Sequence, residues 1–226
     1  LSLCCWWCGV WTTERKRKMT SVLAPEKWNR KATLTYLKMG LDALPEPFQT
    51  QESNKLTIVY FILSAYDVMD ALDSTILSKP DLSSQIIDYV YSLQVSLDPD
   101  SPDSNVCGGF RGGTNNGNPW NPSCKVTEKI EWDYGHLANT YVALAILKMM
   151  GDDLGKVNKQ SIIASIKNLQ LEDGSFRSIP IDSESDMRFI YCAAVISHML
   201  NDWSGIDIDR ATRYILASQA YDGAFG

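Results

Sequence analysis

Few residues of this 226-residue chain have both the type and the spacing that catalysis requires. His136 and His198 are the only two histidines, and neither lies in a His-Glu-x-x-His pattern or beside a candidate nucleophile. The glycine-rich stretch 108–113 neither follows a predicted strand nor opens a phosphate-binding loop pattern, so it is typical of a turn. These observations argue against a zincin or a hydrolase triad, and they favour packing or capping roles for both histidines.

Arg188 has the setting that most suggests chemistry. It lies within an otherwise apolar predicted helix, where a cation must either be paired or face a polar cavity, because burying it alone is costly. Tyr191 and Cys192 follow three and four positions later and would share its helix face. Two interpretations stay open at this point: a polar cavity in front of Arg188, or a structural ion pair with Asp186 or Glu184.

A second pair of residues, Thr57 and Phe61, lies four positions apart and so shares one face of another apolar helix. Taken alone, the residue types favour a structural interpretation, in which Phe61 belongs to the core and Thr57 is a tolerated helix residue.

The elements that carry these residues are helical from Lys31 onward, and strand alternation is not sustained in any stretch. A first helix is predicted over Lys31–Leu44, ended by prolines 45 and 47. Three pairs of helices follow, at Leu56–Leu72 with Ser84–Gln94, Asp133–Met150 with Asn158–Gln170, and Asp186–Leu200 with Asp207–Gln219. We expect Asp133, Asn158 and Asp207 to be N-caps and Gly151 to end its helix.

The first helix of each pair is apolar on all sides, whereas the second is amphipathic, with stripes such as Ile162, Ile163, Ile166 and Leu169. A helix that is apolar all round must be buried all round. We therefore predict an all-α fold with an inner and an outer layer, in which the hairpins curve side by side into an α/α toroid. No heptad is sustained, which argues against a coiled coil.

A repeated motif closes the amphipathic helices. Gln170-Leu-Glu-Asp-Gly-Ser-Phe176 matches Gln219-Ala-Tyr-Asp-Gly-Ala-Phe225 position for position, and a stretched copy runs from Gln94 to Phe110. Gly lets the chain turn out of a helix, Asp can bond turn amides, and Phe can return the chain to the core. Such recurrence is the signature of a repeat architecture.

Composition narrows the possible partners and location. The formal net charge is −6. Because residues 15–18 form a basic run, the rest of the chain is more acidic still, so nucleic acid is not an expected partner.

Six cysteines are present; outside the first eight residues they are Cys107, Cys124 and Cys192, whose wide spacing indicates reduced thiols in a cytoplasmic protein. We interpret residues 1–18 as a non-native or disordered extension. Their apolar stretch is too short to span a bilayer, so no stable membrane anchor is expected.

Longer motifs make the chain resemble the CaaX prenyltransferase β-subunit family, and within it the geranylgeranyltransferase type I β subunits. They are LTIVYF at 56–61, DVMDALD at 67–73, CGGFRG at 107–112, GDDL at 151–154, LQLEDGSF at 169–176, DMRFIYC at 186–192 and NDWSG at 201–205. The resemblance implies a barrel of six hairpins, of which residues 19–226 would form about half.

The resemblance also implies a function. Such β subunits pair with a helical-repeat α subunit and transfer a geranylgeranyl group from geranylgeranyl diphosphate to the cysteine of C-terminal CaaX boxes, usually ending in Leu, on proteins such as small GTPases. They hold Zn²⁺ through an Asp, a Cys and a His. We expect these ligands and the diphosphate cluster beyond residue 226, so no catalytic or metal-binding residue is assigned here and the chain alone is expected to be inactive.

Substrate-binding residues can be carried over position by position. The resemblance places Thr57 and Phe61 at the far end of the lipid and peptide pocket, Arg188 near the substrate and Tyr191 near the isoprenoid. The farnesyl enzyme has a bulky Trp where this chain has Thr57. The resemblance implies that the smaller Thr57 side chain leaves room for a fourth isoprene unit. The alternatives are a protein farnesyltransferase β subunit and a non-catalytic α/α-toroid scaffold. A downstream Asp-x-Cys motif and a later His would favour a transferase over the scaffold.

Overall fold

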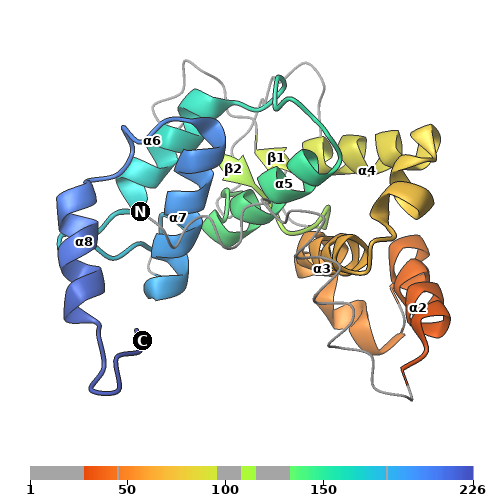
Figure 1. Ribbon diagram of the computed structural model, residues 1–226. Coiled ribbons are helices and arrows are strands. Elements are labelled where there is room, and N and C mark those ends of the chain that lie inside the picture. The colour runs from red at the N-terminus through yellow and green to blue at the C-terminus, as the bar shows by residue number, and fades with distance from the viewer. Residues whose placement is uncertain (1–27, 45, 96–107, 116–132, 182, 226) are drawn as a thin grey trace.

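The computed structural model describes residues 28–225 except position 45, the segments 96–107 and 116–132, and position 182. The predictions for residues 1–18, Cys107 and Cys124 lie outside the described residues. The elements are α2 (Arg30–Asp42), η2 (Glu46–Asn54), α3 (Lys55–Val68), η3 (Asp73–Leu77), α4 (Pro80–Ser92), β1 (Gln94–Val95), β2 (Gly109–Phe110), α5 (Leu137–Met149), α6 (Lys159–Leu169), α7 (Met187–Leu200) and α8 (Ile208–Ala217). They follow an arch that opens toward the bottom of Figure 1, with α2 at one end and α8 at the other.

Helices α3, α5 and α7 form an inner row, and α4, α6 and α8 are their outer partners (Figure 1). Helix α5 packs between α3 and α7, and Lys148 is its only exposed residue. The outer helices bury one face each, as the predicted stripe Ile162, Ile163, Ile166 and Leu169 of α6 does. The two-layer arrangement of helical hairpins therefore follows from the apolar patterning.

The first hairpin departs from the predicted boundaries at both of its helices. Helix α3 ends at Val68 rather than Leu72, because the chain turns at Asp70, whose φ is +54°. The π-helix η3 follows before α4 begins. Helix α4 begins at Pro80 instead of Ser84; proline is favoured in a first helical turn because it has no N–H to leave unpaired.

The start of α5 corrects one predicted cap. His136, rather than Asp133, is the N-cap, and its Nδ1 accepts a hydrogen bond from the N–H of Ala138 at 3.2 Å. Asp133 instead forms a bidentate ion pair with Arg111, with its oxygens 2.5 Å from Nε and 2.9 Å from Nη2. Both side chains are buried, at 8% and 5% exposure. Burying a charge without a partner costs more free energy than leaving a helix end without a cap, and Asp133 therefore pairs with Arg111.

The first and last residues of the repeated motif pair in the same way in all three copies. Antiparallel pairing joins Gln94 to Phe110, Gln170 to Phe176 and Gln219 to Phe225. The prediction that the segment from Gln94 to Phe110 is a stretched copy is therefore confirmed. The two short copies turn at Gly174 and Gly223, whose φ angles of +99° and +85° favour glycine.

The buried ion pair generates a stability prediction. Arg111→Met should lower the free energy of unfolding by about 3–5 kcal/mol, because the Asp133 carboxylate stays buried after its guanidinium partner is lost. Lys38→Met is the matched control, since Lys38 and Asp42 form an exposed pair at 3.9 Å and its loss should cost less than about 1 kcal/mol. Urea unfolding of both variants measures the difference. Equal losses of unfolding free energy in the two variants would contradict the conclusion that the buried ion pair contributes more than the exposed one.

Candidate functional site

Aromatic rings from the three inner helices form a continuous series. Phe61 and Tyr60 of α3, Tyr141 of α5 and Tyr191 of α7 follow one another with ring centroids 5.8, 5.8 and 5.5 Å apart. We call this set the aromatic row. Two of the predicted binding residues, Phe61 and Tyr191, lie at its ends. The packing of α5 between α3 and α7 sets the spacing of the rings.

The hydroxyl groups of the aromatic row bond to one another. The Tyr60 and Tyr141 oxygens are 2.9 Å apart, and Tyr141 also bonds to Tyr191. Burial, and then these two hydrogen bonds, raise the pKa of Tyr141 well above its ordinary value. The Tyr141 phenol therefore stays neutral well above pH 7 and does not supply an anionic base or nucleophile.

The ends of the row are accessible. Phe61 is 63% exposed and Tyr191 is 37% exposed. Phe61 is thus not a core residue, in contrast to the structural interpretation of its residue type. Accessible rings at both ends of the row are suited to an elongated apolar molecule, because each accessible ring can remove apolar surface of that molecule from water.

Thr57 lies one turn before Phe61 on α3 and is half-buried. Its Oγ1 donates a hydrogen bond of 3.4 Å to Oδ1 of the buried Asn139 on α5. The hydrogen bond holds its hydroxyl toward α5.

Arg188, in the first turn of α7, forms the ion pairs that the structural interpretation predicted. Its Nη2 lies 3.0 Å from Glu184 and 2.6 Å from Asp186, and its side chain is 69% exposed. The Arg188 guanidinium holds the pKa of Asp186 below its ordinary value, chiefly through the side-chain hydrogen bond. Asp186 is also the N-cap of α7, because it accepts a bond of 2.8 Å from the Arg188 N–H. The role of Arg188 toward a substrate stays a prediction.

Two other sequence predictions near this site have different outcomes. Cys192 is buried, at 6% exposure, and does not share the accessible face of Arg188 and Tyr191. His136 caps α5 and packs edge-on against Phe189, with ring centroids 6.1 Å apart, as the capping prediction implies. Burial lowers the pKa of His136, and the nearby Glu184 opposes this shift.

Sequence reasoning missed Tyr60 and Tyr141, the middle members of the aromatic row. The available signal was a tyrosine within each of two apolar inner helices, at 56–72 and 133–150. A buried tyrosine needs a partner for its hydroxyl. Which residue would supply that partner depends on how α3 and α5 are aligned, and the helical period alone does not specify this alignment.

A groove beside α2 is a concave feature away from the aromatic row. Its lining combines basic residues with Tyr66, and it comprises Arg30, Lys31, Leu34, Thr35, Lys38, Tyr66 and Thr75. Arg30 is already engaged, since its Nη2 donates to the Met69 carbonyl at 2.7 Å. The groove receives no side chain from α5 or α7 and none of the four predicted binding residues. We therefore take the aromatic row as the candidate site.

Across the described part of the chain, no three His, Cys, Asp or Glu side chains come together as metal ligands. The residues present thus do not form a zinc site, and the prediction of ligands beyond residue 226 is not tested by this observation. In the same residues, every helix is too short or too polar to cross a lipid bilayer.

Comparison with known proteins identifies the family. Residues 28–226 match the prenyltransferase alpha-alpha toroid domain. The chain belongs to the prenyltransferase α/α-toroid family. It is 40% identical over 196 residues to the geranylgeranyl transferase type-1 subunit beta of Arabidopsis thaliana, which covers 85% of this chain and 49% of that protein. The subunit of the same name from Dictyostelium discoideum is 35% identical over 205 residues, covering 88% and 57%.

Farnesyltransferase relatives are more distant. The protein farnesyltransferase subunit beta of Arabidopsis thaliana is 26% identical over 200 residues, covering 87% of this chain and 34% of that protein. The chain spans about half the length of the curated geranylgeranyl relatives that it matches.

A solved structure supports the toroid architecture. It is titled Candida albicans protein geranylgeranyltransferase-I complexed with GGPP, and it matches 85% of this chain and 52% of its own with a TM-score of 0.63. At 20% sequence identity, the similarity establishes the fold alone. The predicted α/α toroid is thereby confirmed.

Arg188 can be tested against a matched arginine. Arg210 also pairs with the N-cap aspartate of its own helix, Asp207, at 3.4 Å, but on the outer helix α8. In an active assembly that contains this chain, Arg188→Ala should raise the KM for substrate about tenfold, the loss expected for one charge-assisted hydrogen bond. Arg210→Ala should leave KM unchanged.

Both arginine variants should change the thermal midpoint by less than about 4 °C, because exposed ion pairs contribute little. Steady-state kinetics and thermal unfolding are the measurements. Unchanged kinetics for Arg188→Ala, or a loss confined to stability, would reject a substrate role.

The buried Tyr141 phenol generates a pH prediction. The folded protein holds this phenol neutral, whereas the unfolded chain ionises near the ordinary tyrosine value of about 10. Its contribution to stability is complete below about pH 10 and is lost as the pH rises further. Tyr141→Phe should therefore flatten the alkaline decline of stability, measured by urea unfolding between about pH 8 and 11. Tyr36→Phe, whose ring is 56% exposed, should keep the wild-type decline. Equal slopes in the two variants would refute the assignment.

Proposed function

We propose that the complete protein is the β subunit of a CaaX protein geranylgeranyltransferase. It would transfer a geranylgeranyl group from geranylgeranyl diphosphate to the cysteine of C-terminal CaaX boxes. In this proposal the aromatic row and Thr57 bind the polyprenyl chain. The proposal extends beyond the present chain, because the matches cover only 49% and 57% of the relatives that support it.

The observation that carries the proposal is an aromatic row beside a small residue, in a chain whose geranylgeranyl relatives are the more similar ones. Identity is 40% and 35% to the two geranylgeranyl subunits, against 28% and 26% to two farnesyl subunits. A polyprenyl chain is long and apolar, which is the ligand class that aromatic surface spanning three helices favours. The small Thr57 supports the longer of the two prenyl groups.

Each predicted binding residue then has a distinct task. Phe61 and Tyr191 would contact the prenyl chain from α3 and α7. Tyr141 would position the Tyr191 ring directly and the Phe61 ring through Tyr60. Arg188 would contact the polar part of a substrate from the start of α7. Any anionic group that binds Arg188 must compete with the carboxylates of Glu184 and Asp186. This competition favours a contact that orients the substrate over one that supplies most of the affinity.

Four further parts of the proposal do not rest on the described residues. They are an α-subunit partner, CaaX proteins as substrates, a cytoplasmic location and dependence on Zn²⁺. Because the described residues hold no metal-ligand cluster, we derive no catalytic step from zinc here. The residues of this chain would supply substrate binding and orientation, which are needed before any thiol can attack the prenyl carbon.

The length of the prenyl group provides the test. In the complete heterodimer, Thr57→Trp should lower kcat/KM for geranylgeranyl diphosphate about 5- to 150-fold, since overfilling a packed site costs about 1–3 kcal/mol. Use of farnesyl diphosphate should be retained or should rise. Competition between the two diphosphates for one CaaX peptide measures the change in preference.

Thr57→Ser is the matched control, because it keeps both the small volume and the hydroxyl that bonds to Asn139. It should retain the wild-type preference. If Thr57→Trp lowers the use of both diphosphates equally, Thr57 does not determine chain length. If the wild-type heterodimer transfers no prenyl group at all, the proposed function itself fails.

A further inference from the structure

Phe110, Arg111 and Gly112, which we call the first strap, bond to α5, α4 and α3 in turn. The Phe110 carbonyl accepts from a backbone N–H at the start of α5, at 3.1 Å. The Arg111 N–H donates to the carbonyl of Leu93, the C-cap of α4, at 2.9 Å. The Gly112 carbonyl accepts from the N–H of Leu56, the second residue of α3, at 2.8 Å.

The next turn of the repeat is followed by an equivalent segment, Phe176, Arg177 and Ser178, which we call the second strap. The Arg177 N–H donates to the carbonyl of Leu169 at the end of α6, at 3.0 Å. The Ser178 carbonyl accepts from the N–H of Leu137, the first residue of α5, at 2.9 Å. Each strap therefore joins the end of an outer helix to the start of the inner helix of the same hairpin.

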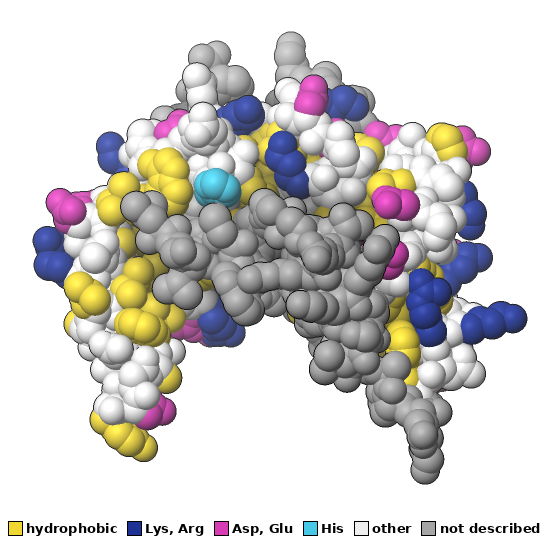
Figure 2. All heavy atoms as spheres, in the orientation of Figure 1, with side chains coloured by type: hydrophobic (Ala, Val, Ile, Leu, Met, Phe, Trp, Pro, Cys, Tyr) yellow, Lys and Arg dark blue, Asp and Glu magenta, His cyan; other side chains and the backbone are white. Residues whose placement is uncertain are grey.

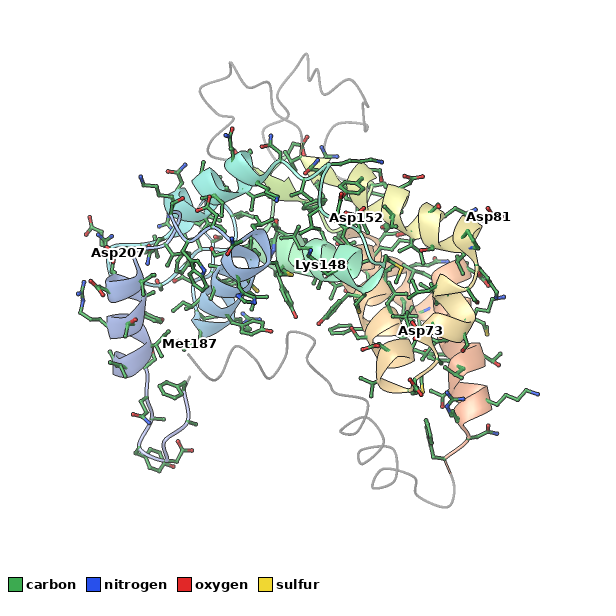
Figure 3. The ribbon with its side chains drawn as sticks, turned by 45° about the horizontal axis from the view of Figure 1, so that its top comes forward. Asp73, Asp81, Lys148, Asp152, Met187 and Asp207 are labelled. Atoms are coloured by element: carbon green, nitrogen blue, oxygen red, sulfur yellow. The ribbon has the colours of Figure 1, made fainter. Side chains whose placement is uncertain are left out.

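The second strap also contacts the segment that leads into the next inner helix, and it does so through its backbone. The Ser178 N–H donates to the Glu184 carbonyl at 3.3 Å. Arg177 and Ser185 pair antiparallel. Met187 begins α7 two residues later (Figure 3). The second strap thereby holds the start of α5 against the start of α7.

The first strap makes the corresponding contact through a side chain. The Arg111 guanidinium binds Asp133, three residues before the N-cap of α5. The charged side chains visible in Figure 2 lie mainly along the top and the sides of the arch, whereas these two are buried. Because Gly109 and Gly112 lie on either side, the backbone of the first strap has little conformational preference of its own. A planar guanidinium that binds a carboxylate through two nitrogens supplies the fixed geometry.

The first strap also lies very close to the residues that hold Thr57. A Cβ at Gly112 would overlap the Ser53 carbonyl oxygen and would lie 2.9 Å from Nδ2 of Asn139. Ser53 lies just before α3, and Asn139 on α5 accepts the hydrogen bond from Thr57. Gly112 thus occupies the space between the start of α3 and the α5 residue that bonds to Thr57.

We propose that the two straps set the alignment of the inner helices, and that Arg111 and Gly112 are positioning residues for the proposed prenyl site. Thr57 directly follows the residue whose N–H bonds to Gly112. Phe61 lies about 8 Å from that N–H along the helix axis, at about 1.5 Å per residue. A displacement of the first strap therefore moves both residues relative to Tyr141 on α5. The effect on substrate rests on the proposed function, whereas the alignment is independent of any substrate.

Thermal unfolding tests the alignment without a substrate. Tyr60→Phe removes the hydrogen bond to Tyr141 between α3 and α5, so it should lower the midpoint of the wild-type chain by roughly 2–4 °C. In an Arg111→Lys background the same change should lower the midpoint less than half as much, because lysine lacks the planar fork and the displaced helices separate the two hydroxyls. Effects of independent residues would add. Arg177→Lys is the matched control and should preserve the full loss, since the second strap is held by backbone bonds.

Prenyl preference tests the consequence for the site. In an active assembly that contains this chain, we compare kcat/KM for geranylgeranyl diphosphate with kcat/KM for farnesyl diphosphate. Arg111→Lys should lower this ratio about tenfold, because a misplacement of about 1 Å is enough to impair a positioned contact. Gly112→Ala should lower the ratio as well, and Arg177→Lys should leave it unchanged. A loss of folded protein alone would lower both values equally and preserve the ratio.

The inference is overturned if Tyr60→Phe lowers the midpoint equally in the two arginine backgrounds. It is also overturned if Arg111→Lys and Gly112→Ala both keep the wild-type ratio, or if Arg177→Lys changes the ratio as much as Arg111→Lys does. If the wild-type assembly transfers no prenyl group, the proposed function fails instead, and the thermal comparison still decides whether the first strap aligns α3 with α5.

Discussion

Helix α5 must be covered on nearly every side, and most of the structure depends on that requirement. Its neighbours α3 and α7 cover two sides, and α4 covers a third. The polar residues of α5 are used in the same packing. Thr140 accepts from the Phe110 N–H and donates to the His136 carbonyl, both at 3.0 Å. The stretched turn is thereby fixed onto α5 without leaving a buried hydroxyl unbonded.

The inner and outer layers of helices could be predicted from the sequence, because each depends on a local pattern. The inner helices are apolar on all sides, and the outer helices are apolar on one side. Ends of elements were predicted less well, because they depend on competition between interactions. Asp133 is a good N-cap by type, yet Arg111 binds it at a distance of 22 positions along the chain. No helical or strand period links those two residues. Asn158 and Asp207 cap as their residue types predict, and the cation that pairs with Asp207, Arg210, lies in the first turn of the same helix.

The candidate site shows the same division between local and non-local information. Thr57 and Phe61 could be placed on one helix face by spacing alone, and Arg188 could be given its two acidic partners. The aromatic row could not be predicted, because its order depends on which turn of α5 lies opposite Tyr60. Tyr141 joins α3 to α7 through hydroxyl bonds on either side. A change in helix alignment by one turn would separate those oxygens by about 5 Å.

The residues that define the candidate site and those that join the hairpins are different sets. On α3, the buried Leu56, Val59 and Leu63 hold the helix in the core, whereas Thr57 and Phe61 lie toward accessible surface. The hairpins are joined instead by turn residues beyond the outer helices, such as Gln94 and Gln170. A substitution at Thr57 can therefore alter the shape of the proposed binding surface while the contacts between hairpins persist. This separation gives a physical reason why one toroid architecture can accommodate prenyl groups of different length, since only side chains on the accessible face of the inner row need to differ.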